Sequence, residues 1–214
     1  MTAPRLHPSD EMIFDYARGA LDAGRALVVE THIGACAACR TGARIAEAVG
    51  GALLTELPPT PMAPDALERA LASLERPAPA SSAPARGPSD WIDVPPAVLD
   101  AYRTRKRWAA PGVWVATVSH DRRSGKRTYL LGIGANIAVP RHSHRGRELT
   151  CVLKGAFADG PTVHAAGDFV ECDEAIEHQP KTTADGECVC LIAVDHRLVP
   201  RSWMAHVLQP FVGI

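Results

Sequence analysis

Aromatic side chains, net charge and long apolar runs are all scarce in this chain of 214 residues. Only 5% of the residues are aromatic, and the formal net charge is −1 at pH 7. A chain without a positive excess has no general electrostatic attraction for nucleic acid, so we expect no direct DNA binding. The longest charge-free runs, 128–140 and 202–214, are interrupted by Gly, Pro or polar residues, so no membrane span is predicted.

A secretory signal is also lacking, because the first residues, MTAPRLHPSDEM, contain no apolar core. We therefore expect a cytoplasmic protein. Six cysteines are present, and in a reducing compartment they are expected to be thiols or thiolates, not structural disulfides. Cysteines at metal-ligand spacing in such a compartment favour metal binding.

A segment made almost entirely of Pro, Ala, Ser and Gly divides the chain. Residues 77–89 cannot bury apolar surface, so they are predicted to form a linker. The linker separates residues 1–76 from residues 90–214, and we expect each part to be a domain.

The first part has apolar residues at helical spacing and is predicted to form a four-helix domain. Ser9 can cap the first helix, which Gly24 would end. The second helix covers about 26–33, the third begins near Cys36, and the fourth follows Pro64. Four short helices make a thin core, which a bound metal would stabilise.

The second part consists of short runs rich in Val, Ile, Leu, Thr and Tyr, separated by Gly, Pro and Asp. This pattern is typical of an all-β sandwich or barrel. The fold class is therefore α + β multidomain, with helices before the linker and strands after it. The predicted strands cover residues 113–118, 127–133, 149–153, 162–164, 168–172 and 187–194.

The first part contains the motif His32-x3-Cys36-x2-Cys39. Thiolates three residues apart in a first helical turn face one side, and a helix N-terminus lowers the pKa of a thiol. One imidazole and two thiolates leave zinc one ligand short of a tetrahedron, and His7 could complete the site. The two cysteines could also be a redox pair, or small core residues.

HxxxCxxC within an acidic helical domain of this size resembles the zinc-binding anti-sigma domain of bacteria. The resemblance implies that His7, His32, Cys36 and Cys39 bind zinc. It also implies that the four-helix domain wraps a sigma factor and covers the surfaces that would contact core RNA polymerase.

The second part contains a different ligand pattern, His142-x-His144-x3-Glu148, followed by Gly155 and later by His178. Side chains two apart on a strand point to the same face, so both histidines would aim at one point. Imidazoles with a carboxylate are ligands for zinc, iron or manganese. The alternative is a metal-free barrel with solvated histidines.

This pattern resembles the first motif of the cupin superfamily, a small β-barrel, and the segment from Gly167 to His178 resembles the second. The resemblance implies four ligands: His142, His144, Glu148 and His178. Asp173 and Ala175 stand where Pro and Gly are common in the second motif, which could change the turn before His178.

Helical zinc domain, linker and cupin together resemble the ChrR-type anti-sigma factors. That family implies a protein that holds a group IV, or ECF, sigma factor silent as a 1:1 heterodimer and releases it in response to singlet oxygen or related oxidants. It implies zinc in both domains and no enzymatic activity, although the second ligand set would also accept iron, manganese or nickel.

Two further cysteines, Cys188 and Cys190, would share one strand face and could take part in the oxidant response, or could be small core residues. The alternative function is a metal-dependent cupin enzyme, a dioxygenase or isomerase. That function does not explain the upstream HxxxCxxC motif or the linker. Passive zinc storage, a third possibility, would need no partner.

Overall fold

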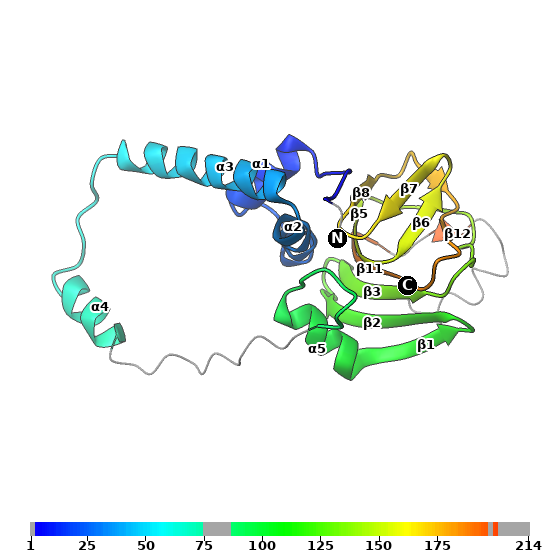
Figure 1. Ribbon diagram of the computed structural model, residues 1–214. Helices are drawn as coiled ribbons and strands as arrows, with labels where there is room; N and C mark the ends of the chain where they lie inside the picture. The colour runs from blue at the N-terminus through cyan, green and yellow to red at the C-terminus, as the bar shows by residue number, and fades with distance from the viewer. Residues whose placement is uncertain (1–2, 75–86, 197–198, 201–214) are drawn as a thin grey trace.

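The computed structural model describes residues 3–74, 87–196 and 199–200, which form five helices followed by strands (Figure 1). The helices are α1 (Asp10–Ala17), α2 (Ala23–Ala35), α3 (Ala37–Thr55), α4 (Ala66–Leu74) and α5 (Pro96–Arg105). The strands are β1 (Lys106–Ala110), β2 (Val113–His120), β3 (Arg127–Ile133), β4 (His142–Ser143), β5 (Glu148–Lys154), β6 (Ala156–Asp159), β7 (Thr162–Ala165), β8 (Phe169–Cys172), β9 (Glu177–His178), β10 (Lys181–Thr182), β11 (Cys188–Val194) and β12 (Val199–Pro200). Among the described residues, no helix combines the length and apolar character needed to cross a membrane.

The first helices begin at side-chain caps. Ser9 Oγ accepts a hydrogen bond from the backbone N–H of Met12, which confirms the predicted cap of α1. The predicted end at Gly24 is wrong: α1 ends at Ala17, and Gly19 follows with a φ of 69°. Gly24 lies in the first turn of α2, because the Asp22 side chain accepts from the N–H groups of Gly24 and Arg25.

The described residues do not form the predicted packed bundle of four helices. α1, α2 and α3 contact one another, whereas α4 buries no residue. In Figure 1, α3 runs away from the strands and α4 stands apart from the other elements. The apolar spacing of α4 predicts a helix, as observed, but within the described residues this stripe packs against no other element.

A fifth helix, α5, corrects the prediction that residues 90–214 are all β. It begins at Pro96, a residue that suits the first helical position. Val98, Leu99 and Ala101 are buried against the strands that follow. The paired prolines Pro95 and Pro96 were a helix-start signal that the strand-rich sequence after them obscured.

The strands form three sheets and no closed barrel within the described ranges. Six strands hydrogen-bond in the order β1-β2-β3-β11-β5-β8. Two smaller sheets, with the orders β10-β6-β7 and β12-β4-β9, complete the strand-rich part. The predicted strands correspond to β2, β3, β5, β7, β8 and β11, and the six described strands that the sequence did not predict have only two to five residues each.

The large sheet is apolar on both faces, as its central strands show. In β5, Leu149, Cys151 and Leu153 belong to one buried cluster, whereas Val152 belongs to another. The first cluster also contains Val28 and Val29 of α2, so the helices before the linker share one continuous core with the sheet after it. The second cluster lies on the opposite face, beside the smaller sheets.

Candidate metal centres

The residues of the HxxxCxxC motif and His7 come together at one point. Their ligand atoms all lie within 4.8 Å of one another. His32 Nε2 lies 3.2 Å from Cys39 Sγ, and His7 Nδ1 lies 3.4 Å from the sulfur atoms of both Cys36 and Cys39. A tetrahedral zinc ion would place nitrogen and sulfur about 3.5 Å apart, so the spacing fits zinc.

The corner between α2 and α3 creates this arrangement. Cys36 has an extended backbone, with φ −113° and ψ 110°, and it both ends α2 and begins α3. His32 lies in the last turn of α2, and Cys39 lies in the first turn of α3. The tight corner therefore turns a spacing of seven residues in sequence into direct contact.

The chemistry of these groups also suits a cation. Burial, followed by the neighbouring Cys36, raises the pKa of Cys39 to about 12, which is opposite to the lowering expected at a helix N-terminus. Burial lowers the pKa of His32, so its imidazole is neutral and offers a lone pair. A bound metal would have to displace the thiol proton, and its positive charge would stabilise the thiolate.

The second ligand set converges through three histidines. The Nε2 atom of His178 lies 3.0 Å from Nε2 of His142 and 3.0 Å from Nε2 of His144. Strand pairing brings them together, because His142 on β4 is directly opposite His178 on β9. Bonds of about 2.0–2.1 Å to one metal would place such nitrogens about 3.0–3.4 Å apart.

The other ring nitrogen of each histidine faces an oxygen atom. His142 Nδ1 donates to the carbonyl oxygen of Pro140 at 2.8 Å, and His178 Nδ1 lies 2.6 Å from Asp159 Oδ2. His144 Nδ1 lies 3.3 Å from Glu148 Oε2. Outer partners of this kind fix the ring orientation of metal-binding histidines, and here they hold His142 and His178. His144 Nδ1 makes no hydrogen bond with the described residues, in spite of its contact with Glu148.

Glu148 is the one expected ligand that does not join this group. The group whose ligand atoms lie within 4.8 Å of one another contains His142, His144 and His178. The Glu148 carboxylate contacts His144 Nδ1 and accepts from the hydroxyl of Thr150 at 3.2 Å. Burial raises the pKa of Glu148 to about 7, so this carboxyl lacks a nearby positive charge that a bound metal would supply.

A cavity of about 70 Å³ lies beside the histidines, between the large sheet and the smaller ones. Glu148, Cys188 and Cys190 line it, together with Cys172. The sulfur atoms of Cys188 and Cys190 are 3.8 Å apart and buried. Cys188 and burial raise the pKa of Cys190 well above its ordinary value, so the Cys190 side chain is a protonated thiol at neutral pH.

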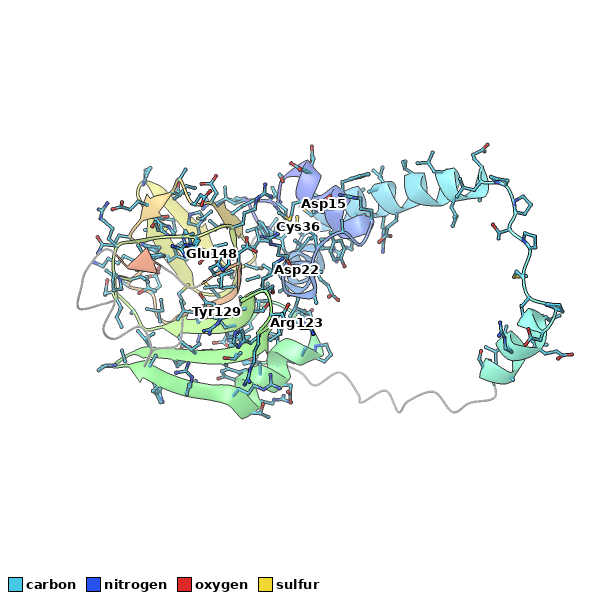
Figure 2. The ribbon with its side chains drawn as sticks, turned by 180° about the vertical axis from the view of Figure 1, so that it is seen from behind. Asp15, Asp22, Cys36, Arg123, Tyr129 and Glu148 are labelled. Carbon is cyan, nitrogen blue, oxygen red and sulfur yellow. The ribbon has the colours of Figure 1, made fainter. Side chains whose placement is uncertain are left out.

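Sequence reasoning missed the outer partners of both centres. Asp159 precedes His178 by 19 residues, and Gly167, whose carbonyl oxygen accepts from His32 Nδ1 at 2.8 Å, follows His32 by 135. Residues this far apart in the sequence form no local motif, so neither pair could be predicted from spacing. In Figure 2, Cys36 lies where the helices meet the strands and Glu148 lies among the strands, so the two centres are separate.

Two models of known protein families match this chain, and each match contains one of the two ligand motifs. A family model described as "ChrR Cupin-like domain" matches residues 98–197, and one described as "Putative zinc-finger" matches residues 9–40. The second match contains His32, Cys36 and Cys39, and the first contains all the histidines of the downstream group.

A curated relative matches almost the whole chain. The anti-sigma-E factor ChrR of Cereibacter sphaeroides is 36% identical over 214 residues, which cover 98% of this chain and 99% of the relative. The crystal structure of Rhodobacter sphaeroides SigE in complex with the anti-sigma ChrR matches with a TM-score of 0.73 and 34% identity. That match covers 90% of this chain and 100% of the other.

Proposed function

Because this chain belongs to the ChrR family of anti-sigma factors, we propose that it binds and inhibits a group IV, or ECF, sigma factor in a zinc-dependent manner. The observation that carries the proposal is the match over both parts of the chain to a protein named for anti-sigma activity. An enzyme built on a cupin would not need the upstream cluster. We therefore assign a regulatory role, with no catalysis, no direct DNA contact and no membrane contact.

An unburied apolar stripe gives the sigma factor a place to bind. Ile45, Val49, Leu53 and Leu57 recur every four residues along α3 and just beyond it, and each is more than half exposed. The stripe continues in α4. We call the exposed apolar residues of both helices the α3–α4 surface: Ile45, Val49, Leu53, Leu54, Leu57, Leu67, Leu71 and Leu74. Amphipathic helices with such stripes typically bind a partner through the apolar face.

Zinc at His7, His32, Cys36 and Cys39 would hold α2 and α3 at the angle that directs this surface. In small domains of this kind the metal site forms only when the chain folds, so the free energy of metal binding stabilises the folded state. We propose that the partner and the chain form a 1:1 heterodimer; the related ChrR forms a complex with SigE.

The downstream centre would act as the sensor of singlet oxygen or a related oxidant. We propose His142, His144 and His178 as its ligands, joined by Glu148 once its carboxylate turns away from His144 Nδ1, with zinc as the metal. Cys188 and Cys190 are proposed as groups that respond to oxidation. The cavity supports this proposal, since it brings Glu148 and both thiols to the side of the histidines. Oxidation there would have to lower the affinity for the sigma factor, because a signal acts only through such a difference.

The first test replaces the upstream thiols. Cys36→Ser with Cys39→Ser should lose one equivalent of zinc and abolish capture of the sigma factor in a pulldown, because the corner between α2 and α3 loses its metal. Cys188→Ser with Cys190→Ser is the matched control and should keep its zinc and still capture the sigma factor. Normal capture by the first variant would overturn the zinc-dependent mechanism.

The second test separates sensing from inhibition. His178→Ala should leave inhibition of sigma-dependent transcription intact but weaken induction by singlet oxygen severalfold, because the downstream centre loses a ligand. The exposed His120→Ala serves as the control. An unchanged induction curve for His178→Ala would remove the sensor role and leave the inhibitor role standing.

A further inference from the structure

The turn between β7 and β8 reaches out of the strand-rich part to the first residues of the chain. Its carboxylate, Asp168, is only 1% exposed. Asp168 Oδ1 accepts hydrogen bonds from the backbone N–H groups of Arg5 at 2.7 Å and Leu6 at 3.2 Å. Its other oxygen, Oδ2, accepts from the N–H of Ala165 at 2.9 Å. One buried carboxylate thus joins two segments that are more than 160 residues apart.

The next residue fastens the same segment from its other side. The N–H of Phe169 donates to the carbonyl oxygen of Leu6 at 3.0 Å. Leu6 immediately precedes His7, an exposed residue that lies outside any helix. The hydrogen bonds at Arg5 and Leu6 are therefore the nearest fixed points on the N-terminal side of the His7 imidazole.

The turn also holds a second ligand directly. The carbonyl oxygen of Gly167 accepts from His32 Nδ1 at 2.8 Å, which leaves Nε2 without a proton and facing Cys39. Gly167 has a φ of 95°, and a Cβ there would lie 2.8 Å from a side-chain carbon of Pro4. Only glycine fits this turn without strain or displacement of the N-terminal segment. The ring of Phe169 packs against His32 edge to face, at a centroid distance of 5.7 Å.

We infer that this turn of the cupin-like part positions two ligands of the upstream zinc site, with Asp168 holding His7 through Arg5 and Leu6, and Gly167 holding His32. The inference rests on the zinc binding proposed above and assigns part of its outer shell to the sensor side of the chain. Loss of outer partners typically weakens metal binding about 10–100-fold. The upstream site would therefore bind zinc most tightly when α2 and α3 are packed against the sheet.

The test uses the full chain loaded with cobalt, because thiolate-to-cobalt absorption reports the Cys36–Cys39 site and not a site made of histidines. Asp168→Ala should accelerate loss of this absorption to a chelator by about tenfold or more. Asp185→Asn, an exposed carboxylate before β11, is the control and should match the unaltered chain. An Asp168→Ala chain that releases cobalt at the unaltered rate would overturn the inference.

A second variant approaches the contact from the other side. Deleting residues 2–6 removes the donors of Arg5 and Leu6 but keeps every residue of the strand-rich part, so it tests the contact even if Asp168→Ala fails to fold. We expect it to release cobalt as quickly as Asp168→Ala, and slow release would contradict the role of the segment. If the unaltered chain showed no thiolate-to-cobalt absorption, the proposed zinc site itself would fall, which is a different outcome.

Discussion

At the scale of single residues, two histidines of the downstream centre, His142 and His178, are held by a hydrogen bond from the outer ring nitrogen. The shortest of these contacts is the 2.6 Å pair between Asp159 Oδ2 and His178 Nδ1. A carboxylate in that position orients the ring and makes the opposite nitrogen more basic, which strengthens its bond to a metal. Asp159 is thus a positioning residue for His178.

Replacement of this carboxylate tests the role. Asp159→Asn should weaken metal binding at the downstream centre about 10–100-fold, as measured by competition with a chelator. Cobalt absorption from the Cys36–Cys39 site should stay unchanged, and Asp173→Asn, in the exposed turn before β9, should behave as the unaltered chain. Equal metal affinity in Asp159→Asn would show that His178 needs no orienting partner.

The sequence predicted ligands better than it predicted their surroundings. His32, Cys36 and Cys39 lie within eight residues, so they stay close together even though the chain turns a corner at Cys36. The partners Asp159 and Gly167 come from other strands, and only the folded sheet brings them close. Glu148 shows the same limit, since its spacing suggested a ligand whereas its carboxylate contacts the outer nitrogen of His144.

At the scale of elements, α4 is predicted to serve the partner and not the fold. Leu67 and Leu71 are 68% and 54% exposed, and no residue of the helix is buried. Helical spacing identified this helix in the sequence, but the same spacing cannot tell whether an apolar face meets its own chain or another one. The expected four-helix core was wrong for that reason.

Polar replacements on α4 separate the two roles. Leu67→Ser with Leu71→Ser should weaken sigma binding at least tenfold, as measured by titration calorimetry, because the partner loses apolar contact area. The midpoint of urea unfolding should not change. Glu68→Ala with Arg69→Ala is the control in the same helix and should keep its affinity. Full affinity in the leucine variant would move the binding surface elsewhere.

At the scale of the whole molecule, an ion-pair network joins α2 to the downstream ligand loop. Asp195 Oδ2 lies 2.6 Å from Arg25 Nη2 and accepts from the N–H of Arg147 at 2.9 Å. Arg147 immediately precedes Glu148, so one carboxylate contacts both parts of the chain. The predicted linker, residues 77–89, lies largely outside the described residues, and its composition gave no sign that the parts before and after it pack together.

Removal of the Asp195 carboxylate should lower the free energy of unfolding more than removal of its cationic partner Arg25. Asp195→Ala should lower the free energy of unfolding by about 1–2 kcal/mol, because it removes both the exposed hydrogen bond from the N–H of Arg147 and the ion pair with Arg25. Arg25→Ala removes a partly exposed ion pair and should cost about 1 kcal/mol or less, with a smaller effect at high salt. Urea unfolding at two salt concentrations measures both, and equal costs would contradict the bridging role.

The alternation along β5 has a mechanical consequence. Glu148 and Thr150 line the cavity, while Leu149 and Cys151 face the opposite way, into the core shared with α2. Successive side chains of a strand point to opposite faces, so a backbone shift at Glu148 also moves Leu149. A displacement that begins at the cavity would therefore reach the core that β5 shares with α2 across a single peptide bond.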